Sequence, residues 1–82
     1  MKTSKKQQEK TNLKIIETAV NLFIQKGFEK TTMREISREA GIGDATIYNY
    51  FSTKERIIWG YIELRQKQEI IKLNNITDIA NY

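Results

Sequence analysis

The stretch Gly41–Phe51, GIGDATIYNYF, decides the expected fold of this chain. A short apolar helix is expected to end at residues 40–42, and a second short helix is expected to begin at residues 43–44. The second helix carries small and hydrogen-bonding side chains with no acid–base pair among them: Thr46, Tyr48, Asn49 and Tyr50. A helix, a tight glycine-containing turn and a second helix with a polar outer face suit insertion into the major groove of DNA. The stretch therefore predicts a sequence-specific DNA-binding module.

The first predicted helix of the chain runs from about Lys10 to Lys26. Apolar residues recur there with helical spacing and cover about half of the circumference. They are Leu13, Ile15, Ile16, Ala19, Val20, Leu22, Phe23 and Ile24. Gly27 supplies a residue that adopts positive φ without strain and is expected to end the helix. So wide an apolar arc predicts that this helix packs on more than one neighbour.

The second predicted helix begins near Met33, because Thr32 and Glu35 have the spacing of a capping box. The third helix can be capped by Gly43 or Asp44. The residues expected to face inward from these two helices are Met33, Ile36, Ala40, Ile47 and Phe51. Most other side chains of the third helix are then exposed. A helix that buries so few side chains contributes little to the core, which favours a role as a contact surface.

A longer fourth helix is predicted from about Thr53 to about Leu73, capped by Ser52 with Glu55. The pair at residues 74–75, Asn-Asn, is expected to break it. Trp59 lies off the main apolar face of this helix, on the side of Arg56, Glu63 and Gln66. Two readings of Trp59 stay open: it covers the first helix, or it contacts a second domain or subunit.

The sequence divides into three parts. Residues 1–9 read as a flexible basic arm, residues 10–73 as a helical domain with a helix-turn-helix at about 32–51, and residues 74–82 as the start of a truncated C-terminal domain. The lysines in or next to the arm are Lys2, Lys5, Lys6 and Lys10. They form either a solvated tail or an arm that adds phosphate or minor-groove contacts.

Composition narrows the function classes. The chain has 82 residues, no Cys, no His, no Pro and a formal net charge of +4. The absence of Cys and His argues against disulfides, zinc sites and nucleophile–His catalysis, and no metal or other cofactor is predicted. No apolar run approaches the roughly 20 residues of a membrane helix. We therefore expect a cytoplasmic protein whose mild basicity permits a polyanionic partner.

Residues from about Leu13 to Ile62 resemble the DNA-binding domain of the tetracycline-repressor (TetR) family. The matching motifs, in order, are Ala19–Gly27, Phe28 with Thr31–Thr32, Arg34–Ile36, Ala40–Ile42, Ala45–Tyr48, Tyr50–Phe51 and Lys54–Glu55. The resemblance implies an all-α fold, with a three-helix helix-turn-helix domain and a longer fourth helix. It also implies a ligand-responsive repressor that binds a double-stranded DNA operator and dimerises through a C-terminal domain that also holds a small-molecule inducer.

The resemblance also implies which residues meet DNA. Those expected to approach base edges are Arg34, Asp44, Ala45 and Tyr48, and those expected to contact phosphates are Thr32, Thr46, Asn49, Tyr50 and Lys54. Lys54 has a physical reason of its own, because it lies in the first turn of a helix, where free backbone N–H groups attract anions.

This chain departs from the family pattern at two neighbouring positions. Gly43 stands where many members carry a serine, and Asp44 places an acidic group on the surface expected to face DNA. Residues 41–53 contain no Lys or Arg, so within the helix-turn-helix only Arg34 and Arg38 can read guanine bidentately. Asp44 either caps the third helix or accepts a hydrogen bond from a cytosine amino group.

Two other function classes, a protein-interaction module and an enzyme, fit the sequence less well than DNA binding does. A helical protein-interaction or assembly module fits the wide apolar faces, but its binding would lack the steep salt dependence of phosphate contacts. An enzyme fits poorly, because the carboxylates lie mostly on helix surfaces beside basic residues, such as Glu35 with Arg38.

Overall fold

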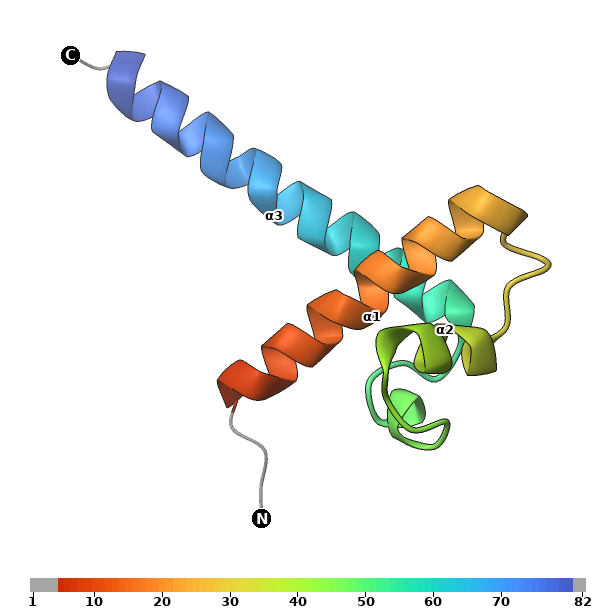
Figure 1. The fold of residues 1–82 in the computed structure, drawn as a ribbon. Coiled ribbons are helices and arrows are strands. Elements are labelled where there is room, and N and C mark those ends of the chain that lie inside the picture. The colour runs from red at the N-terminus through yellow and green to blue at the C-terminus, as the bar shows by residue number, and fades with distance from the viewer. Residues whose placement is uncertain (1–4, 81–82) are drawn as a thin grey trace.

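The described part of the chain consists of helices and the loops that join them. A computed structural model describes the backbone of residues 5–80 and the side chains of residues 5–68, and this part contains no strand. The elements are α1 (Lys5–Lys26), α2 (Met33–Ala40), the 3-10 helix η1 (Thr46–Asn49) and α3 (Lys54–Ala80). Figure 1 shows α1 crossing α3, with α2 on one side of the crossing and the later part of α3 extending away. The all-α fold class, a helix-turn-helix domain with a longer last helix, is confirmed.

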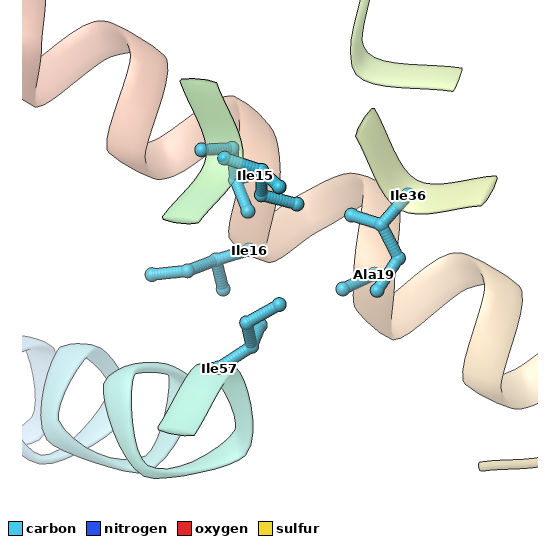
Figure 2. Packing of buried hydrophobic residues seen from close by; sticks show 6 residues of the cluster. Ile15, Ile16, Ala19, Ile36 and Ile57 are labelled. Carbon is cyan, nitrogen blue, oxygen red and sulfur yellow. The ribbon is translucent and has the colours of Figure 1, made fainter. Parts of the chain in front are cut away.

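The core forms where α1 meets the other elements. Side chains from all four elements come together there, as Figure 2 shows for most of them: Ile15, Ile16, Ala19, Ile36, Ile47 and Ile57. Each is at most 3% exposed. Because α1 contacts both α2 and α3, the prediction that its wide apolar arc packs on more than one neighbour is confirmed.

Two apolar residues of α1 lie outside this core. Leu13 is 40% exposed and Ile24 is 78% exposed, although both were predicted to belong to the apolar face. At 100° per residue they lie about 20° apart around the helix, at one edge of the arc. The neighbouring elements cover the part of the arc around Ile15 and Ala19 instead.

Helix α1 begins earlier than the sequence indicated. It starts at Lys5 and not near Lys10, so the predicted start of this helix is wrong, while the flexibility of an arm at residues 1–9 stays a prediction. Lys, Gln and Glu are good helix formers, and no Gly or Pro interrupts them. The remainder of the predicted arm, with Lys2, lies outside the described residues.

The ends of α1 and α2 follow the predicted local signals. Gly27 and Gly41 have φ values of 92° and 73°, which only glycine adopts without strain. Thr32 and Glu35 form the predicted capping box, in which the Thr32 hydroxyl accepts from the Glu35 N–H at 3.1 Å. The Lys26 ammonium donates to Glu35 Oε2, and this hydrogen bond is the largest cause of the lowered pKa of the Glu35 carboxyl. The end of α1 is thereby tied to the start of α2.

The third helix is shorter and tighter than predicted. In place of an α-helix capped by Gly43 or Asp44, the chain forms a single 3-10 turn with no side-chain cap. The backbone N–H groups of Thr46 and Ile47 both donate to the Gly43 carbonyl, at 3.0 and 3.3 Å. The Asp44 carboxylate contacts Ser37 and Arg34 of α2 instead, so the Gly43 carbonyl and not a side chain accepts from these two N–H groups.

Helix α3 also corrects two predictions. Its first turn is capped by Thr53, whose hydroxyl accepts from the Arg56 N–H at 3.2 Å, and not by Ser52 with Glu55. The helix continues to Ala80, so the predicted break at residues 74–75 is wrong. Asn lowers helix propensity only modestly, and no Gly or Pro follows Gly60. The assignment of residues 74–82 to a second domain stays a prediction.

Trp59 lies on an open side of α3. Its side chain is 63% exposed and borders a surface cleft with Phe51, Ser52 and Arg56 but with no residue of α1. The exposure argues against the reading in which Trp59 covers the first helix. We expect the fluorescence of the isolated chain to have the emission maximum of solvent-exposed tryptophan and to be quenched efficiently by iodide. A strongly blue-shifted, poorly quenched emission would show that Trp59 is covered.

Candidate nucleic-acid interface

The turn between α2 and η1 sets the direction of the second element. Gly41 turns the chain with positive φ, and its N–H donates to the Arg38 carbonyl at 3.1 Å. The next N–H, that of Ile42, donates to the Ser37 carbonyl at 2.9 Å, while the Ile42 side chain packs against the core. Since both carbonyls belong to the last turn of α2, the turn is fixed relative to that helix.

One buried residue orients η1. Ile47 is fully buried, whereas its neighbour Tyr48 is 56% exposed. The predicted contact residues around them are exposed as well, apart from the half-buried Tyr50: Asp44, Ala45, Thr46 and Asn49. The structure therefore places the predicted reading surface on the outside of the domain, next to α2.

Arg34 and Asp44 meet at the edge of this surface. Arg34 Nε lies 3.3 Å from Asp44 Oδ2, and the two side chains are 68% and 49% exposed. The Ser37 hydroxyl lies 2.8 Å from Asp44 Oδ1, and this hydrogen bond is the first cause of a lowered Asp44 pKa, followed among the lowering causes by the charges of Arg34 and Arg38. The interpretation of Asp44 as the cap of the third helix is wrong, because its carboxylate faces α2.

Thr32 and Lys54 are occupied within the protein. The Thr32 hydroxyl caps α2. The Lys54 ammonium lies 2.7 Å from the Phe28 carbonyl and 3.1 Å from the Thr31 carbonyl, and it stands 4.3 Å from the centre of the Phe28 ring. Lys54 therefore joins the start of α3 to the α1–α2 connection. Its predicted phosphate contact, like that of Thr32, stays a prediction.

The first turns of α1 also lie beside η1, which the sequence did not indicate. The first turns of α1 border an open cleft of about 560 Å³ together with η1. The lining residues are Lys5, Gln8, Glu9 and Asn12 from α1, and Thr46, Asn49 and Tyr50 from the η1 region. The α1 residues follow the i, i+3, i+4, i+7 spacing of one helix face. This polar spacing could have indicated a second surface beside η1. It was not recognised in the sequence, because the helix was expected to start near Lys10.

Comparison with known proteins identifies this arrangement. The family model of the bacterial regulatory proteins, tetR family, matches residues 15–58, which include α2, the turn and η1. The chain belongs to the TetR family. The recognition made from the sequence motifs is thereby confirmed.

Several curated relatives are similar to this TetR-family chain. An uncharacterized HTH-type transcriptional regulator, YfiR of Bacillus subtilis, is 34% identical over 73 residues, which are 89% of this chain and 36% of YfiR. IcaR of Staphylococcus epidermidis, the negative transcriptional regulator of the biofilm operon icaADBC, is 41% identical over 44 residues, 54% of this chain and 24% of IcaR. The probable HTH-type transcriptional regulator YttP of Bacillus subtilis is 52% identical over 44 residues, 54% of this chain and 21% of YttP. The chain thus spans little more than a third of these relatives at most.

The lengths and compositions of the helices also bear on membrane insertion. Within the described residues, none of them combines the length and the apolar character that crossing a bilayer needs.

Proposed function

We propose that this chain is the DNA-binding part of a cytoplasmic, sequence-specific transcriptional repressor. The observation that carries the proposal is the exposed polar surface of η1. The buried Ile47 side chain holds η1 against the core, and the turn at Gly41 fixes η1 beside α2. A short helical element held in this way can enter the major groove and present its side chains to base edges. Family membership and the negative regulator IcaR among the relatives support the direction of control.

The proposal includes a homodimer and an inducer. Dimerisation would pair two reading surfaces on one face of the operator, with half-sites about one helical turn or a multiple of it apart. A small-molecule inducer would act from a C-terminal domain. Support for both comes from family membership.

Binding without catalysis completes the proposal. Two carboxylates of the α2–η1 region have partners within the protein: Glu35 pairs with Lys26, and Asp44 contacts Ser37 and Arg34. Both carboxylates have a lowered pKa, which makes them weaker bases than free carboxylates.

Selection of bound duplexes from a random DNA pool tests the proposed function directly. We expect enrichment of a defined half-site, and we expect the affinity for it to fall steeply with salt because phosphate contacts release counterions. Absence of enrichment, or a binding activity that salt leaves unchanged, would contradict DNA recognition and favour a protein-interaction module.

Tyr48→Ala is expected to weaken binding to the selected site roughly fivefold or more beyond its effect on random DNA. The side chain is 56% exposed on η1, so its removal takes away a base contact without opening the core. The measurement is the dissociation constant of each variant on the selected and the random duplex. Tyr48→Phe, which keeps the ring, separates the role of the hydroxyl. Equal losses on both duplexes would make Tyr48 a residue that only positions the domain.

A further inference from the structure

An ion pair on the reading surface does little for the stability of the fold. Arg34 and Asp44 approach within 3.3 Å, but both side chains are largely exposed, at 68% and 49%. Exposed pairs of this kind contribute little to folding, because water solvates the separated charges well. The position of this pair, at the edge of the exposed η1 surface, gives it a different use.

The carboxylate of this pair is held from two sides. Asp44 Oδ2 receives Arg34 Nε, while Asp44 Oδ1 lies 2.8 Å from the hydroxyl of Ser37, which is fully buried in α2. The same hydroxyl lies 2.8 Å from the Arg34 carbonyl oxygen and can donate its one proton to either acceptor. Asp44 is therefore connected to α2 through a fixed group as well as through the flexible arginine.

This arrangement leaves the recognition end of the guanidinium available. Arginine has five N–H donors, and the contact with Asp44 uses Nε. The two terminal nitrogens carry the other four N–H donors, and Asp44 is the acidic side chain that pairs with this guanidinium among the described residues. Two parallel donors are what the O6 and N7 atoms of guanine accept in the major groove.

We infer that Asp44 is a specificity-determining residue that acts through Arg34, by holding the guanidinium with its terminal nitrogens toward a guanine. This inference rests on the proposed DNA-binding function. Holding the side chain beforehand reduces the rotamer freedom that a long arginine loses on binding. Positioning Arg34 in this way would also explain why an acidic residue, Asp44, lies on a surface proposed to face DNA, although the charge of Asp44 repels phosphates.

A direct contact of Asp44 with a cytosine amino group is the competing explanation. In that case Asp44 selects its own base pair, and its effect does not depend on Arg34. The two explanations differ in a double-mutant comparison, because only the first requires the two effects to be coupled.

The test compares sites selected from random DNA by the full chain as wild type, Arg34→Ala, Asp44→Asn and the double variant. The base position at which Arg34→Ala loses guanine preference defines the Arg34-dependent position. We expect Asp44→Asn to reduce guanine preference there by about fivefold or more, the lower end of what one bidentate arginine contributes. Random DNA should be bound equally or more tightly, since a negative charge is removed. In the Arg34→Ala background, Asp44→Asn should change nothing at this position.

Glu39→Gln is the matched control, because Glu39 is an exposed carboxylate of α2 that borders α1 residues and not η1. It should leave the selected profile unchanged, and circular dichroism confirms that each variant is folded. An unchanged or increased guanine preference in Asp44→Asn would overturn the inference, as would an effect that persists without Arg34. If the wild type selects no sequence, the proposed function fails with it, whereas a selected site with uncoupled variants removes the inference alone.

Discussion

Ile36→Ala is expected to lower the free energy of unfolding by about 2–5 kcal/mol, the range for deleting a buried isoleucine side chain down to Cβ. Ile36 is fully buried and brings α2 onto α1 beside Ile15 and Ala19 (Figure 2). A chain of this size has a small core and little stability in reserve. Urea denaturation followed by far-ultraviolet circular dichroism measures the loss, and part of the variant should be unfolded without urea.

Ile24→Ala is the matched control, because it removes the same atoms from a position that is 78% exposed. Its effect should stay within about 0.5 kcal/mol, as is usual for surface substitutions. Similar losses from the two variants would mean that the core is not centred on the contact between α1 and α2. The comparison therefore tests, in the absence of DNA, the packing that positions the proposed DNA-binding surface.

Features with local causes could be predicted from the sequence. The capping box of Thr32 and Glu35 depends on residues three positions apart, and the turn at Gly41 depends on the glycine itself. The apolar spacing of α1 likewise specified which helix would lie at the centre. The motifs between Ala19 and Glu55 indicated the family from the sequence alone, and the family model matches residues 15–58.

Features that depend on contacts between different elements of the fold could not be predicted from local sequence patterns. Asp44 has the chemistry of a helix cap, but Ser37 and Arg34 engage its carboxylate, and η1 forms without a side-chain cap. Ile24 has the spacing of a core residue, but none of the described elements covers it. In both cases the deciding partner, or its absence, lies in another element of the structure.

The contacts of Lys54 were even harder to predict from the sequence, because its hydrogen-bond partners lie 23–26 residues earlier in the chain. Its ammonium lies within 3.4 Å of three backbone carbonyls of the α1–α2 connection, those of Phe28, Glu29 and Thr31. A cation 4.3 Å from the Phe28 ring centre adds an attraction to the ring face. The sequence indicated a phosphate contact at a helix start, and the structure adds a role that holds α3 to the rest of the domain.

Lys54→Met is therefore expected to destabilise the chain in the absence of DNA, by about 1.5–3 kcal/mol, the range for hydrogen bonds to charged groups. Methionine keeps the length of the side chain but offers no donor to the carbonyls. Urea denaturation measures the loss, with Lys30→Met as the control, since Lys30 is exposed in the same connection. Equal stability of the two variants would contradict the structural role of Lys54.

The same variant also tests the predicted phosphate contact of Lys54, because the two roles affect different measurements. A phosphate contact lowers the slope of log affinity against log salt concentration by about one unit when it is lost. A residue that only joins α3 to the α1–α2 connection changes stability and leaves the slope of the folded protein unchanged. If the slope falls along with stability, the ammonium must exchange carbonyl partners for a phosphate on binding, which would link DNA contact directly to the anchoring of α3.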